Sequence, residues 1–198
     1  MSRTHLIVPG LNGSGDGHWQ HHWMADHEHS ELVEQTDWSN PHAGRWLARL
    51  ERAVIVHPGA ILIGHSLGAI LIARLASSSV APLVGGAVLV APADIERTST
   101  IHARTYEFDT LPIDALPFPA LVIASRNDDY MSQEKARSLT AAWGATFLGF
   151  GDNGHINIAS GFGRWTGGYD LAQQIEAKAD RRLRHDIGKG LVENVYQI

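Results

Sequence analysis

The segment GHSLG, residues 64–68, places Ser66 between two glycines. The apolar run AILIG leads into it and the apolar segment LGAILIARLA follows it. A serine in such a strand-to-helix turn is held in a strained backbone conformation that exposes its hydroxyl group, and the glycines make room for the neighbouring backbone. The pattern therefore predicts that Ser66 is a nucleophile. The other interpretation is a tight turn in which the serine only caps a helix.

A serine hydroxyl becomes a good nucleophile when a base, oriented by a carboxylate, removes its proton. Where a G-x-S-x-G turn supplies the serine, the acid and then the histidine follow it along the chain. Asp128 comes after the run ALVIA, and His155 after TFLGF. We therefore expect Asp128 and His155 to complete a catalytic triad, with Asp129 and Asp94 as alternative acids.

The negative oxygen of a tetrahedral intermediate needs two backbone N–H donors. One is expected from Leu67, the residue after the nucleophile. The other is expected from Leu11 in the glycine-rich loop PGLNGSG, residues 9–15, with Asn12 as the alternative donor. This loop lacks the G-K-[ST] and G-x-G-x-x-G patterns of phosphate-binding loops, which disfavours nucleotide binding.

The chain has 12 histidines, and several of them cluster in HWQHHW, residues 18–23. His18 and His22 have the spacing of a metal pair on one helix face, but no E-x-x-H partner accompanies them. We therefore expect no metal and no cofactor. The residues expected to line the substrate pocket are Asn12, His18, His65, Trp38 and Trp165.

Composition excludes several classes of protein. The chain has 198 residues, a net charge of −5 and no cysteine, which excludes thiol catalysis and disulfides and disfavours nucleic-acid binding. Neither a signal peptide nor a membrane-spanning run is visible. We expect a single cytoplasmic domain over residues 1–198 that does not act at a membrane. Its last ~14 residues form a C-terminal extension that the pattern does not place.

Short apolar runs alternate with amphipathic stretches, as in α/β folds with a parallel sheet. We predict about six mostly parallel strands in one sheet, helices on both faces and functional loops at the carboxyl ends of the strands. The longest connection, Ile95–Pro119, has room for a small lid but not for a large cap domain. The expected strands are His5–Pro9, Glu31–Gln35 at an edge, Ala60–Gly64, Gly86–Ala91, Ala120–Ala124 and Thr146–Phe150. The expected helices are Trp19–Asp26, Ala43–Val56, Leu67–Ser77, Ser132–Trp143 and Tyr169–Arg184.

Six motifs spread between about residue 5 and residue 166 resemble one family: PGLNGSGDGHWQHHW, TDWSNP, IGHSLGA, VAPAD, ASRNDDY and GHINIASGFGRW. The chain resembles the small serine hydrolases typified by retinoblastoma-binding protein nine and their bacterial relatives. The resemblance implies a minimal α/β-hydrolase fold and a triad of Ser66, Asp128 and His155. Bacterial members often have proline where this chain has Asp129, which places a second carboxylate beside the expected acid.

The residues and the resemblance together predict a metal-independent serine hydrolase of the carboxylesterase type (EC 3.1.1). It is expected to cleave small carboxylic esters, or amides, through an acyl-enzyme. The alternative is a protein-interaction module in which catalysis is vestigial or minor, although the sequence indicates no protein partner. Lyase or perhydrolase chemistry on the same triad is a third hypothesis, because the fold alone does not choose the acceptor.

Overall fold

Six strands form one sheet in a computed structural model that describes residues 3–108 and 110–195, with side chains described as far as Asp186. All five strand pairings are parallel, and the spatial order is β2-β1-β3-β4-β5-β6. The strands are β1 (His5–Val8), β2 (Ser30–Leu32), β3 (Ile61–His65), β4 (Gly86–Val90), β5 (Ala120–Ala124) and β6 (Thr146–Gly149).

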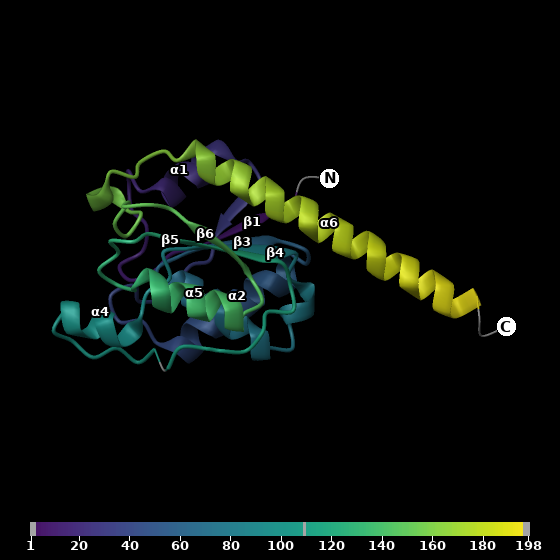
Figure 1. Ribbon diagram of the computed structural model, residues 1–198, viewed down its shortest axis with the longest axis horizontal. Coiled ribbons are helices and arrows are strands. Elements are labelled where there is room, and N and C mark those ends of the chain that lie inside the picture. Colours follow the sequence, from purple (N-terminus) through teal and green to yellow (C-terminus); the bar gives the residue numbers. More distant parts are fainter. Residues whose placement is uncertain (1–2, 109, 196–198) are drawn as a thin grey trace.

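Helices cover both faces of the sheet, as Figure 1 shows. One face packs against α1 and α6, and the other against α2, α3 and α5. The helices are α1 (Trp19–Asp26), α2 (Ala43–Val56), α3 (Leu67–Ala73), α4 (Ile95–Ile101), α5 (Gln133–Ala142) and α6 (Thr166–Val195). The predicted α/β fold, with one sheet and helices on both faces, is confirmed.

Neighbouring residues of the central strands point into opposite cores. In β3, Leu62 joins the core under α2, α3 and α5, while Ile61 and Ile63 join the core under α1 and α6. A strand buried on both faces carries apolar residues at consecutive positions, which explains the unbroken runs in the sequence. The strand β2 is more polar because it lies at an edge, as expected.

The chain reverses its direction of winding between β1 and β3. From β1 it crosses to β2 on one side, and it then returns to β3 on the other side of β1. In open α/β sheets, such a reversal leaves a crevice outside the carboxyl ends of the two strands between which it occurs, here β1 and β3. The loop after β1 and the turn at Ser66 both lie at this crevice, because they follow β1 and β3 directly.

Several boundaries differ from the sequence-based expectation by one to three residues, and the edge strand expected at Glu31–Gln35 is the shorter β2, Ser30–Leu32. Three differences are larger. The expected helix Leu67–Ser77 divides into α3 and a 3₁₀ turn, Arg74–Ser77. The connection after β4 holds the helix α4, which the sequence did not indicate; Asp94 caps it by accepting the Glu96 N–H. The last helix is longer than expected: α6 includes most of the C-terminal extension, and residues 196–198 lie outside the described part of the chain.

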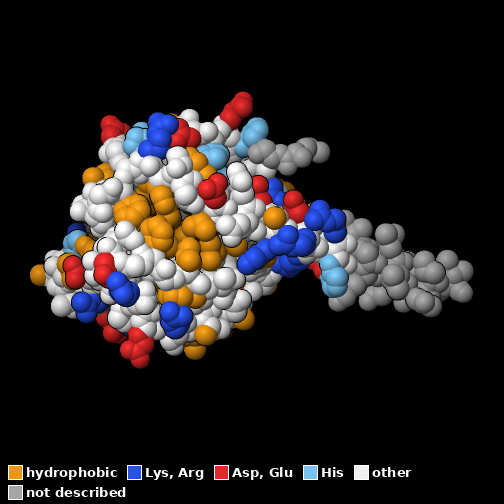
Figure 2. Space-filling model, turned by 45° about the horizontal axis from the view of Figure 1, so that its top comes forward, with side chains coloured by type: hydrophobic (Ala, Val, Ile, Leu, Met, Phe, Trp, Pro, Cys, Tyr) orange, Lys and Arg blue, Asp and Glu red, His pale blue; other side chains and the backbone are white. Residues whose placement is uncertain are grey.

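The helix α6 packs along β3 and β4 and then projects from the globular body (Figure 1). It follows the loop that leaves β6, and near its middle Asp180 pairs at 2.7 Å with Arg3, which precedes β1. Figure 2 shows Lys and Arg side chains gathered on α6 near the point where it leaves the body. None of the described helices combines the length and the apolar character needed to cross a membrane.

Replacing Gly68 by alanine is expected to lower the free energy of unfolding by about 3 kcal/mol or more. A Cβ atom there would lie 2.0 Å from the Val8 carbonyl oxygen and 2.5 Å from that of Pro9, and backbone atoms do not move aside as a flexible side chain does. Gly15→Ala is the control, because a Cβ there meets nothing within 4 Å. Urea denaturation measures both changes, and equal stability of the two variants would contradict this account.

Candidate active site

Ser66 sits in the strained turn that its sequence pattern predicted. Its φ and ψ angles are 56° and −123°, a region that residues other than glycine rarely occupy. Its N–H donates to the Val90 carbonyl oxygen at 3.0 Å, which ties the turn to β4. A Cβ on Gly64 would lie 2.9 Å from the Ala69 Cα atom and one on Gly68 would lie 2.0 Å from the Val8 carbonyl oxygen, so backbone leaves little room for a side chain at either glycine.

The structure brings Ser66, His155 and Asp128 into one chain of hydrogen bonds. The Ser66 Oγ lies 2.9 Å from His155 Nε2, and His155 Nδ1 lies 2.9 and 3.0 Å from the two Asp128 carboxylate oxygens. Each of the three residues is only 8% exposed. In this arrangement Nδ1–H donates to Asp128, which leaves Nε2 free to accept the serine proton.

The two alternative acids lie elsewhere. The Asp94 carboxylate caps α4 and forms an ion pair with Lys135. Asp129 is exposed, and its carbonyl oxygen accepts a hydrogen bond from Arg97. Of the three candidate carboxylates, only that of Asp128 bonds to the imidazole of His155.

The loops that carry the acid and the histidine are bonded to each other. Asn127 Oδ1 accepts the Gly154 N–H at 2.8 Å, and Ser125 Oγ accepts the Asn153 N–H at 2.8 Å. Arg126 adds an exposed ion pair with Asp152 at 2.6 Å. These contacts fix the position of His155 relative to Asp128 before any substrate binds.

Two further residues orient the histidine. The ring of Tyr130 stacks on that of His155 with centroids 4.2 Å apart, and the Tyr130 N–H donates to Asp128 at 2.8 Å. His65 Nε2 donates to the His155 carbonyl oxygen at 2.9 Å. Complete burial, followed by the charge of His155, holds the pKa of His65 well below its usual value, so this ring is a neutral donor.

Ser66 opens into a pocket of about 210 Å³. Of the five residues expected to line it, Asn12, His18 and His65 do so. Trp38 and Trp165 are not among the lining residues: Trp38 packs against Trp46, and Trp165 packs against Trp19 in the core. Large aromatic side chains on loops bury their surface against the body of the protein, which accounts for the difference.

Four lining residues were not singled out from the sequence: Thr98, His102, Tyr130 and Asn157. The first two belong to α4 and its C-cap, an element that the sequence did not indicate. Tyr130 and Asn157 stand two residues after Asp128 and His155, respectively, on the strand-exit loops. Their place in those loops is the signal that could have identified them.

The loop that carries Leu11, one of the two residues expected to bind the oxyanion, passes close to the serine. A Cβ on Gly10 would lie 2.7 Å from the Ser66 Cβ and 3.0 Å from the Leu67 nitrogen, so the loop after β1 passes directly beside the turn. The Asn12 N–H donates to the Trp38 carbonyl oxygen at 2.8 Å. That bond occupies Asn12, the alternative donor, and favours Leu11 as the partner of Leu67.

His18, one of the two histidines with the spacing of a metal pair, is hydrogen-bonded within the fold. His18 Nδ1 accepts the Gln20 N–H at 3.2 Å and so caps α1. Burial, followed by the nearby His155, lowers the pKa of His18 to about 4. Among the described residues, no three His, Asp or Glu side chains come together in a way that could hold a metal ion.

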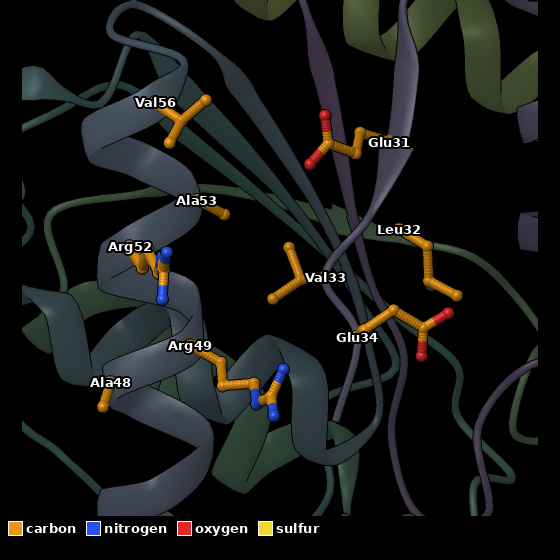
Figure 3. Close-up of a pocket in the computed structure, with 9 residues that line it drawn as sticks. All are labelled: Glu31, Leu32, Val33, Glu34, Ala48, Arg49, Arg52, Ala53 and Val56. Carbon is orange, nitrogen blue, oxygen red and sulfur yellow. The ribbon is translucent and has the colours of Figure 1, made fainter. Parts of the chain in front are cut away.

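A larger hollow of about 510 Å³ lies between α2 and the edge of the sheet at β2 (Figure 3). Arg49 and Arg52 extend from α2, opposite Glu31 and Glu34 on the β2 side. The hollow shares no lining residue with the Ser66 pocket and is a separate feature of the surface.

A family model described as serine hydrolase matches residues 5–174. The chain belongs to the serine hydrolase family. Among curated proteins, no sequence matches it significantly.

Solved structures of other hydrolases share the fold of this serine hydrolase. A YdeN-like hydrolase from Pectobacterium atrosepticum is 32% identical, with a TM-score of 0.76 over 90% of this chain and 91% of that one. The ydeN gene product of Bacillus subtilis is 19% identical, with a TM-score of 0.71 over 89% of this chain and 100% of that one. The Bacillus cereus carboxylesterase has a TM-score of 0.56 at 14% identity, over 90% of this chain and 89% of its own.

Asp128→Asn is expected to lower kcat by about 10⁴-fold, because an amide no longer holds the imidazole in the productive tautomer. Asp129→Asn is the matched control on the adjacent residue and should leave kcat unchanged. Steady-state hydrolysis of a chromogenic ester measures both. A larger loss in Asp129→Asn would instead identify Asp129 as the acid.

Stability is expected to fall as the pH drops from about 6.5 towards 4. The pKa of His18 is about 4 in the folded protein and 6.5 in an unfolded chain, so the unfolded chain binds more protons in this window. His18→Ser keeps an N-cap but removes the titrating group. It should reduce the slope of the unfolding free energy against pH by up to about 1.4 kcal/mol per pH unit, the value for one proton. Denaturation at a series of pH values tests this, and equal slopes in the two proteins would contradict it.

Proposed function

We propose that the protein hydrolyses small carboxylic esters, and amides more slowly, through an acyl-enzyme on Ser66. The observation that carries the proposal is the unbroken set of contacts from Ser66 Oγ through His155 to Asp128. A vestigial site would have no reason to keep all three groups buried and aligned, because burying polar groups costs free energy. The resemblance to the retinoblastoma-binding protein nine branch and the cytoplasmic location remain predictions.

The proposed reaction follows from the roles of the three side chains. Ser66 Oγ attacks the ester carbonyl carbon as its proton passes to His155 Nε2. The N–H groups of Leu67 and Leu11 bind the oxyanion, and the proton on Nε2 then passes to the leaving alcohol. Water repeats the sequence on the acyl-enzyme, with His155 acting again as the base. Asp128 stays ionised and stabilises the charged imidazole in both steps.

The size of the pocket argues for a short acyl group. A volume of about 210 Å³ is below the range of about 300–1,000 Å³ typical of pockets for drug-sized ligands. The α4 helix contributes Thr98 to the wall, and the part of the connection after β4 that the structure describes supplies no larger cover. We therefore propose small substrates that enter without the movement of a cap domain.

A fluorophosphonate probe is expected to label wild-type protein on Ser66 and to leave Ser66→Ala unlabelled. With a 4-nitrophenyl ester whose acyl-enzyme hydrolyses more slowly than it forms, the same enzyme should release a burst of 4-nitrophenol close to one equivalent per site. Mass mapping of the adduct identifies the labelled residue. A folded wild-type protein without an adduct would overturn the proposal and favour the alternative, a protein-interaction module.

A further inference from the structure

The wall of the Ser66 pocket is polar but carries no charged side chain apart from the reacting groups. No Lys, Arg, Asp or Glu is among the described residues that line it. Any selectivity for a polar acyl group must therefore come from neutral hydrogen-bonding groups. His18 and Asn157 each carry two polar side-chain atoms. One atom of each is hydrogen-bonded within the protein, and the other has no partner among the described residues.

His18 presents a fixed donor. Its side chain is almost wholly buried, and its Nδ1 accepts the Gln20 N–H at 3.2 Å. A backbone N–H can only donate, so Nδ1 is unprotonated and the proton of the neutral ring sits on Nε2. This Nε2–H has no hydrogen-bond partner within the described part of the chain, while the residue lines the pocket.

Asn157 presents a second donor by the same reasoning. Its Oδ1 accepts both the N–H and the hydroxyl of Ser160, each at 3.0 Å, and so caps a short 3₁₀ turn. Because the Ser160 N–H can only donate, the atom facing it must be the amide oxygen. The Nδ2 amide group has no partner among the residues that the structure describes.

We propose that His18 Nε2–H and Asn157 Nδ2–H form a subsite that binds an unprotonated, uncharged oxygen on the acyl group of the substrate. Esters whose acyl chain carries an ether or keto oxygen fit this description, and purely aliphatic acyl groups leave both donors unpaired. A carboxylate fits less well, because no cation lines the pocket to offset its desolvation. The inference rests on the proposed function and specifies the substrate class of that site.

Two pairs of 4-nitrophenyl esters test the subsite: methoxyacetate against butyrate, and 3-methoxypropionate against pentanoate. Within a pair, one methylene is exchanged for oxygen and the chain length is kept. Each kcat/KM is divided by the rate constant for hydroxide-catalysed hydrolysis of the same ester, which removes the electronic effect of the oxygen. We expect the oxygen-containing ester of at least one pair to be favoured about 10-fold, the effect of one or two good hydrogen bonds.

Two variants remove the donors while keeping the local caps. His18→Ser retains an oxygen for the Gln20 N–H, and Asn157→Asp retains one for the Ser160 N–H but replaces the donor by an acceptor. In both variants the normalised preference for the ether should fall to near one. His42→Ser is the matched control: its Nδ1 also caps a helix, by accepting the Arg45 N–H, and His42 lies outside the pocket lining. This variant should keep the wild-type preference.

The outcomes separate the two proposals. No fluorophosphonate adduct on Ser66 would overturn the proposed function and this inference together. An adduct on Ser66 with normalised ratios near one for both ester pairs in the wild type would overturn the subsite alone. A preference that survives unchanged in either His18→Ser or Asn157→Asp would overturn the proposed pair of donors.

Discussion

The close approach of α3 to the end of β1 is the constraint on which the site depends. The first turn of α3 passes so near the Val8 carbonyl oxygen that only glycine fits at position 68. This approach brings the loop after β1 against the turn at Ser66, where Gly10 lies beside the serine. The reversal of winding between β1 and β3 makes the two segments neighbours, and the glycines let them touch.

The loops that carry the other two groups of the site are bonded to one another. Asn127 and Ser125 join the loop after β5 to the loop after β6, and Tyr130 and His65 hold the histidine from two sides. A triad held in this way loses little entropy when a substrate binds, because its reacting groups are already in place. Two residues of the pocket wall are held in place in the same way: His18 caps α1, and Asn157 caps the 3₁₀ turn.

Much of the fold and the three central residues of the site could be predicted from sequence, for physical reasons. Unbroken apolar runs mark strands buried on both faces, and the order of Ser66, Asp128 and His155 along the chain matches strand ends that meet at one edge. Which of Asp128 and Asp129 contacts the histidine depends on which side chain points inward from a tight turn. Two adjacent aspartates are alike in sequence, so the sequence does not show which one points inward. Two features could not be predicted. The helix α4 is too short for its sequence to show helical periodicity. Trp38 and Trp165, expected at the pocket, are held in aromatic contacts elsewhere, and such packing is not visible in the sequence.

The path of α6 has a practical consequence. The helix begins beyond the loop that carries His155, at the carboxyl ends of the strands, and it passes Arg3 and Gly59 at their amino ends before leaving the body. Its far end is therefore separated from Ser66 by the full length of the sheet (Figure 1). A fluorophore, a solid support or a fused protein attached there would leave the mouth of the pocket open to substrate.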